Sequence, residues 1–269
     1  MIKIDLQSRI AGGRLSLSNA YIKSVAEKLL ADFSPETLKT PQPTDVDAFI
    51  TDYLGFDLRY EWLSHNGWIL GMTNYFETTI ICYDKENHDT VRVYVGDNTV
   101  LIDNRVGEGE NRVRYAYTAG HECGHIIFDN PIIWEQKEKS RRLAMENYSF
   151  EAGEEFHVIQ RRQTAAAKDE AKWTEHYAEY FSSCLILPDA TVKMVALDLL
   201  RKHGIRSDCI HSHNADEERF CLDVLAGGVA SLYDTSKSAA LYKLCDLKIV
   251  RGGGDIIQNM KKKYKIGPM

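Results

Sequence analysis

One five-residue segment, His121-Glu122-Cys123-Gly124-His125, constrains this chain more than any other. The residues on either side continue a helical pattern, and three apolar residues at 126–128 extend its apolar face. Four residues advance a helix by about 400°, so the two imidazoles lie one turn apart on one face and can share a tetrahedral zinc ion. Glu122 is offset from them by about 100°, where a carboxylate can act as general base toward an attacking water. The segment therefore predicts a catalytic zinc site.

A catalytic zinc site needs a third protein ligand and an open position for water. The segment Thr174–Phe181 lies in a second predicted helix and offers two carboxylates one turn apart, those of Glu175 and Glu179. At that spacing, one can bind the metal while the other accepts the N–H of a metal-bound imidazole. The spacing alone does not assign the two roles, and a solvated, charged helix face gives the same pattern.

The two helical segments together resemble the ImmA/IrrE family of metallopeptidases. In the second motif of that family, a glutamate is followed by alanine after three residues, by phenylalanine after six, and by an apolar run that ends in proline. Glu175, Ala178 and Phe181, followed by Leu185–Pro188, fall in that register. Weaker similarities extend the resemblance in patches over about residues 45–250.

The resemblance implies a zinc-dependent endopeptidase in which Glu175 is the third zinc ligand, beside His121 and His125, and Glu122 is the base. Family members usually carry asparagine where this chain has Glu179, which we expect to orient a metal-bound imidazole; the alternative is that Glu179 is a fourth ligand that closes the site. The family also implies a narrow substrate, a helix-turn-helix transcriptional repressor cut once, which switches on genes of a mobile element or a stress response. The rival hypothesis is a regulator that binds a repressor or DNA and keeps zinc as a structural ion. A structural zinc, however, has no use for a base at Glu122.

The order of the predicted elements indicates an α+β protein. Two helices are expected at about residues 18–33 and 45–54, where apolar residues recur at three- and four-residue steps. Short β-rich runs between Phe56 and Asp103 predict a small antiparallel or mixed sheet of four or five strands. Further helices are expected at about 111–128, 172–187 and 189–203, the last capped by Asp189. We therefore expect a zincin-like metallopeptidase domain over residues 1–188 and a helical subdomain over 189–269. The role of the segment 129–171 is left open.

The composition of the chain predicts the cellular compartment in which it is found. Its six cysteines are scattered without a C-x-x-C pair, which in 269 residues is typical of reduced thiols in a cytoplasm. The first six residues lack the basic and apolar parts of a signal peptide, and no apolar run approaches the ~20 residues of a membrane span. We expect a cytoplasmic protein without membrane contact.

The net charge of −6 disfavours nucleic acid as a partner of the whole chain. Residues 228–269 nevertheless carry eight Lys/Arg against three Asp, a balance of +5, and four of these lysines lie in the tail segment 261–265. The stretch Thr235–Leu244 could form part of a helix-turn-helix, with Ser236 as its cap and with Lys237 and Lys243 available to phosphates. Because this stretch holds so few basic residues, we expect a helical subdomain docked on the core rather than a DNA-binding one.

Three weaker patterns complete the candidates. The segment Cys209-Ile210-His211-Ser212-His213 has metal-binding residue types, but its spacing matches no common structural zinc pattern and its surroundings indicate an exposed loop. Cys123 points away from the metal face of its helix, as expected of a packed thiol. The candidates to stabilise the oxyanion of a reacting carbonyl, which nothing in the sequence ranks, are Tyr115, Tyr117, His157 and His176.

Overall fold

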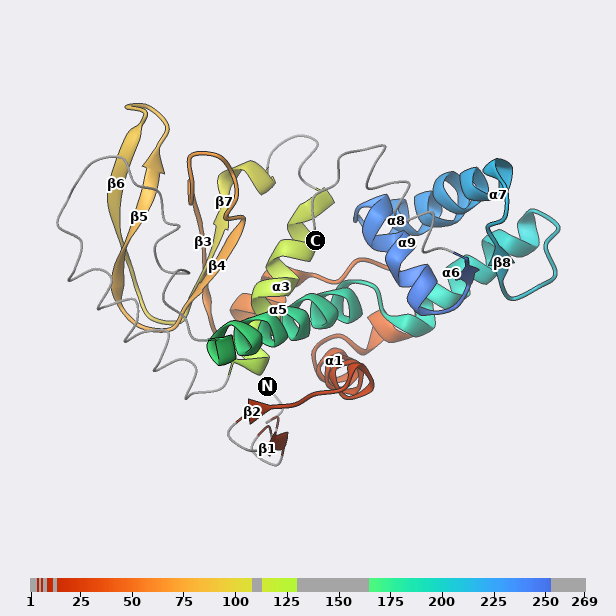
Figure 1. The fold of residues 1–269 in the computed structure, drawn as a ribbon, viewed down its shortest axis with the longest axis horizontal. Helices are drawn as coiled ribbons and strands as arrows, with labels where there is room; N and C mark the ends of the chain where they lie inside the picture. The colour runs from red at the N-terminus through yellow and green to blue at the C-terminus, as the bar shows by residue number, and fades with distance from the viewer. Residues whose placement is uncertain are drawn as a thin grey trace.

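The computed structural model describes residues 14–107, 113–129 and 165–252, together with residues 4, 6 and 9–11. Most of the segment 129–171, the candidate His157 and the basic tail lie outside the described residues. The described part combines helices with small sheets, so the expected α+β class is confirmed (Figure 1). Among the described helices, none has the length and apolar character that a membrane crossing requires.

Three strands form the sheet beside the helices, in the order β3 (Asp57–Glu61), β7 (Thr99–Asp103) and β4 (Gly71–Asn74). β7 pairs in parallel with β3 and antiparallel with β4. Every residue of β7 is buried, as expected of a central strand covered on both faces. β5 (Thr78–Asp84) and β6 (Asp89–Val95) form a separate antiparallel hairpin. The sheet is therefore mixed, and the expectation that all these strands form one sheet is wrong.

The alternation of side chains along β7 explains the separate hairpin. Val100 and Ile102 belong to the main core, whereas Leu101 belongs to a smaller cluster that includes Ile80 and Cys82 of β5. Because successive side chains of a strand point to opposite faces, the second face of the sheet also needs an apolar cover. The hairpin supplies it, and in Figure 1 it lies on the side of the sheet away from α3 (Tyr115–Phe128).

The N-terminal elements follow the predicted helices closely. Ser18 caps α1 by accepting a hydrogen bond from the backbone N–H of Tyr21. The second predicted helix begins at its Asp45 cap, continues as a π-helix, and ends at Gly55, whose φ of 73° suits glycine. The elements of this part and of the chain leading to α3 are β1 (Ile10–Ala11), β2 (Arg14–Leu15), α1 (Asn19–Phe33), η2 (Pro35–Leu38), α2 (Val46–Ala48), η3 (Phe49–Leu54) and η4 (Asn104–Gly107).

Helices α3 (Tyr115–Phe128) and α5 (Ala165–Ile186) cross at the centre of the molecule (Figure 1). A β-carbon added to Gly124 would lie 2.5 Å from the Cα of Ala178, and one added to Gly120 would lie 2.7 Å from the Oγ of Ser182. The two glycines therefore let the helix backbones approach each other. This approach brings the two histidines of α3 within reach of Glu175 on α5.

Because α3 and α5 cross so closely at Gly124, we expect one methyl group added there to destabilise the fold strongly. Gly124→Ala should lower the free energy of unfolding by about 2–3 kcal/mol, because the added carbon meets backbone atoms that cannot rotate away. Gly227→Ala is the matched control: it adds the same carbon at 3.5 Å or more from its neighbours and should be neutral or stabilising by up to ~1 kcal/mol. Urea unfolding of both variants measures the difference, and equal effects would contradict the close crossing.

The C-terminal helices share the core of the preceding part. Buried residues such as Leu225 and Leu244 belong to the same hydrophobic cluster as Leu29 of α1 and Phe181 of α5. The described part of the expected helical subdomain is therefore docked on the core, while a domain boundary at residue 188 stays a prediction. Its elements are α6 (Asp189–Lys202), β8 (Ile210–His211), α7 (Ala215–Arg219), η7 (Phe220–Ala226), α8 (Gly227–Leu232), α9 (Lys237–Asp246) and β9 (Val250–Arg251).

Asp189 ties three helices together. The prediction that it caps α6 is wrong, because Pro188 occupies the cap position without a side-chain hydrogen bond. The carboxylate of Asp189 instead pairs with Lys23 of α1 and, at 2.6 Å, with Lys243 of α9. Burial raises the pKa of Asp189, but the two lysines outweigh burial and hold the pKa below its ordinary value. Lys243 is only 1% exposed, so the expectation that it is available to phosphates is also wrong.

Two lysines of α9 should differ sharply in their contribution to stability. Lys243→Met should lower the free energy of unfolding by about 3 kcal/mol at pH 7, because it takes from the buried carboxylate of Asp189 one of its two partners. Lys237→Met, the control, breaks an exposed pair with Asp223 and should change stability by less than about 0.5 kcal/mol. Chemical denaturation of both variants compares them, and equal losses would contradict the buried network.

The loss in Lys243→Met should also depend on pH. The folded pKa of Asp189 is depressed, so its contribution is present above the pKa of an unfolded aspartate, about 3.9. The contribution is lost as the pH falls through the lower folded pKa. The stability difference between wild type and Lys243→Met should therefore shrink in acid.

Candidate metal centre

Helix α3 places His121 and His125 as the sequence predicted. Their Nε2 atoms lie 3.0 Å apart, and the two rings meet edge to face. His125 is buried and His121 is half-buried. The two imidazoles therefore share one face of α3 and direct the same ring nitrogen to one point.

Glu175 of α5 reaches the same point. Its Oε2 lies 3.2 Å from the Nε2 of His121 and 3.6 Å from the Nε2 of His125. The Glu175 side chain is 56% exposed, so the group is open toward solvent on the α5 side. Within the described ranges, this is the one group of three or more His, Cys, Asp or Glu side chains close enough to hold a metal ion.

The distances within this group fit a tetrahedral ion. Metal–ligand bonds of about 2.0–2.1 Å require about 3.3–3.4 Å between the ligand atoms. The three separations of 3.0, 3.2 and 3.6 Å lie on either side of that value. His121, His125 and Glu175 can therefore hold a metal ion without rearrangement of the two helices.

Asp129 is a site residue that the sequence analysis missed. Its Oδ1 lies 3.3 Å from the Nδ1 of His125, and its Oδ2 accepts a hydrogen bond from the Tyr75 hydroxyl at 3.1 Å. A carboxylate accepts the Nδ1 proton and so leaves Nε2 of that ring for the metal. The signal was present in the sequence, since Asp129 follows His125 by one helical turn.

The charges around His125 favour a cation. Burial lowers the pKa of His125, but the carboxylates of Asp129 and Glu175 outweigh it and raise the pKa to about 10. Burial likewise raises the pKa of Glu175, but both imidazoles outweigh it and hold the pKa below its ordinary value. A site that attracts a proton this strongly also attracts a metal cation, which competes with that proton for the same nitrogen.

The side chain of Glu122 extends from α3 and packs against the edge strand β4. Its side chain is 4% exposed, and its Oε2 accepts a hydrogen bond from the Thr73 hydroxyl at 2.7 Å. A β-carbon added to Gly71 would lie 2.5 Å from the Oε1 of Glu122. Gly71 therefore leaves the space that this carboxylate occupies, and Thr73 fixes its orientation.

Glu179 lies one turn beyond Glu175, and within the described residues its carboxylate makes no direct hydrogen bond to either histidine. Burial raises the pKa of Glu179, while the charge of the nearby His121 lowers it. The Glu179 carboxylate therefore interacts electrostatically with His121. Its expected role in orienting an imidazole stays a prediction. For His125, the observed partner is Asp129.

The described oxyanion candidates differ in their partners. Tyr115 donates a hydrogen bond to Asp47 at 2.6 Å, and the ring of His176 bonds to Asn19 at 3.0 Å. Both are therefore oriented by other elements. The Tyr117 hydroxyl donates to the backbone oxygen of Glu179 at 3.3 Å, beside the site, and it remains a candidate.

The remaining cysteine and histidine patterns do not form a second metal group among the described residues. The rings of His211 and His213 stack on each other, and Cys209 contacts Ser207. Cys123 is fully buried, and burial raises the pKa of its thiol. The interpretation of Cys123 as a packed thiol is confirmed.

No protein-family model matches the chain, and a search of the curated proteins finds no similar sequence. The resemblance to the ImmA/IrrE family therefore stays a prediction from the two motifs.

Proposed function

We propose that this protein is a zinc-dependent endopeptidase. The observation that carries the proposal is the convergence of three ligand atoms, those of His121, His125 and Glu175, next to the buried carboxylate of Glu122, which is not part of the ligand group. Two imidazole nitrogens and one carboxylate oxygen at tetrahedral spacing are a donor set typical of catalytic zinc. Zinc bound by His121, His125 and Glu175 would supply Lewis acidity, which activates water near neutral pH and polarises a carbonyl.

The chain's own residues would move the proton. The Oε2 of Glu122 already accepts the hydrogen bond of the Thr73 hydroxyl. The Oε1 is therefore the oxygen that would take a proton from the water attacking the peptide carbonyl. The same carboxyl then delivers that proton to the leaving amine nitrogen. The burial of Glu122 keeps it in one orientation through both transfers.

An extended peptide suits the surface next to Glu122. Within the described residues, β4 is the edge strand of its sheet and pairs with β7, and an extended peptide can bind to a sheet by adding a strand at such an edge. The resemblance to the ImmA/IrrE family suggests which peptide: a segment of a helix-turn-helix repressor, cut at a single bond. The burial of Lys243 supports a protein substrate rather than DNA as the partner.

The rival hypothesis is a regulator with a structural zinc. A structural site is closed by four protein ligands, and the described residues here offer three, one of them half exposed to solvent. A buried carboxylate held by Thr73 next to the ligands also has no role in such a site. Both observations favour catalysis.

Co-expression with a panel of helix-turn-helix repressors tests the proposal. We expect one of them to be cut at a single bond, with cutting abolished by a zinc chelator and restored by added zinc. Intact repressors in the presence of fully zinc-loaded protein would contradict the proposed substrate. Zinc bound to four protein ligands would favour the regulator instead.

A further inference from the structure

A buried aspartate holds both ends of the loop between β3 and β4. Asp103, the last residue of β7, is fully buried. Its carboxylate accepts the backbone N–H of Leu63 at 2.9 Å, where the loop begins. Its own backbone N–H donates to the carbonyl oxygen of Leu70 at 2.8 Å, directly before β4. The start of β4 is therefore tied to Asp103.

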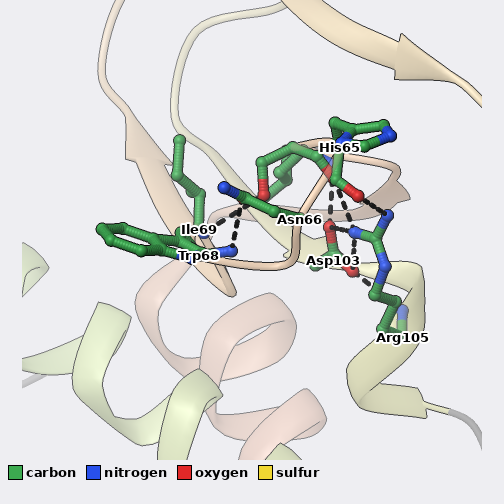
Figure 2. Close-up of polar contacts among 8 residues, drawn as sticks. His65, Asn66, Trp68, Ile69, Asp103 and Arg105 are labelled. Carbon is green, nitrogen blue, oxygen red and sulfur yellow. Dashed lines mark hydrogen bonds and ion pairs between the residues drawn. The ribbon is translucent and has the colours of Figure 1, made fainter. Parts of the chain in front are cut away.

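Arg105 fixes the middle of the same loop. Its guanidinium pairs with the Asp103 carboxylate at 3.0 Å and donates to the backbone oxygens of Ser64 and His65, at 2.7 and 2.9 Å. Figure 2 shows this guanidinium directed at both Asp103 and His65. A planar guanidinium has enough N–H donors to serve these acceptors together. Because burying a carboxylate is costly unless its partners are well placed, the pair favours one arrangement of the loop.

The loop leads into a short strand that contacts the proposed general base. β4 has four residues, so few ladder hydrogen bonds hold it on β7, and its register places Thr73 opposite Val100. In this register the Thr73 hydroxyl donates to the Oε2 of Glu122 at 2.7 Å, and Gly71 leaves room for the Oε1. Successive side chains of a strand point to opposite faces, so a shift of one residue would take the hydroxyl away from Glu122.

We propose that Asp103 and Arg105 are positioning residues, which hold β4 so that Thr73 keeps the Glu122 carboxylate oriented toward the attacking water. The proposal rests on the proposed function for the role of Glu122, but the hold on β4 can be measured without hydrolysis. Misplacing a reacting group by about 1 Å can slow a reaction about a hundredfold, so a displaced β4 should have a measurable effect.

The first test replaces Arg105 by lysine. Lysine keeps a positive charge beside Asp103, so the fold is retained, but it lacks the planar fork that serves two carbonyl oxygens. Hydrogen exchange of the full-length protein, followed by mass spectrometry, should become at least about threefold faster over residues 71–74, because the strand opens locally. Exchange over residues 237–246 of α9 should stay as in wild type.

Arg59→Lys is the matched control. Arg59 also contacts a carboxylate and a backbone oxygen, those of Glu61 and Tyr94, but it lies on β3, on the other side of β7 from β4. The same substitution there should leave exchange over residues 71–74 and the rate of cleavage as in wild type.

The second test follows cleavage of the repressor that the wild-type protein cuts. Arg105→Lys should lower kcat about tenfold and change KM less than about twofold, because the base is disturbed and substrate binding is not. Thr73→Val keeps the shape and removes the hydroxyl, so it should lower kcat by a similar factor, while Thr73→Ser should cut at nearly the wild-type rate. The double variant of Arg105→Lys with Thr73→Val should be at most about threefold slower than Thr73→Val, because the contact through which Arg105 acts is already lost.

Unchanged exchange over residues 71–74 in Arg105→Lys would overturn the inference, as would an equal acceleration over residues 237–246. A kcat equal to that of Arg59→Lys would also overturn it, and so would a double variant about a hundredfold slower than wild type, in which the two losses are independent. A wild-type protein that cuts no repressor contradicts the proposed function instead, and the exchange rates then decide whether the pair holds β4.

Discussion

Replacing Glu122 by glutamine should lower the rate of repressor cleavage about a thousandfold, within the range that a general base contributes. Glutamine has nearly the same shape and can still accept the hydrogen bond of Thr73, so the fold and the three ligands stay in place. Only the ability to take a proton is lost. Cleavage is measured by following the fragments over time at saturating zinc.

Elemental analysis provides the control for this variant. Zinc should remain at about one equivalent, as in wild type, because Glu122 is not among the three residues that could hold the ion. A Glu122→Gln protein that retains its zinc and cleaves at more than a tenth of the wild-type rate would rule out the general-base role.

Replacing Glu175 by alanine should weaken zinc binding by more than a hundredfold. The variant removes one of three ligand atoms, whereas Asp129→Ala removes only the partner that orients His125 and should cost about 10–100-fold. Glu179→Ala should cost less than Glu175→Ala, because its carboxylate lacks a direct hydrogen bond to either ligand imidazole among the described residues. Competition with a zinc-binding dye measures all three affinities.

The order of these affinities tests the assignment of the site. His121→Ala serves as a reference for the loss of a ligand, and Glu175→Ala should resemble it. If Glu179→Ala were the weaker zinc binder of the two glutamate variants, the register taken from the family resemblance would be wrong.

The two candidate histidine ligands could be predicted from the sequence because their spacing is a local property. His121 and His125 are brought together by the pitch of one helix, whatever else the chain does. The carboxylates of Glu175 and Glu179 are likewise a turn apart on one helix, so spacing alone left both open. Their distances to the histidines depend on how α5 crosses α3, and only the tertiary structure placed Glu175 at 3.2 Å from His121.

The partners of these residues were decided by contacts between distant segments. Thr73 and Gly71 reach Glu122 because β4 is the edge of a sheet packed on α3, and no sequence pattern links residue 71 to residue 122. Lys243 appeared available to phosphates in a basic stretch, yet α9 docks so that its charge meets Asp189. Helical periodicity thus determined the candidate metal-binding face of this protein. The packing of helices and strands, which depends on many weak contacts at long range, brought Glu175 to the two histidines, placed Thr73 and Gly71 against Glu122, and buried Lys243.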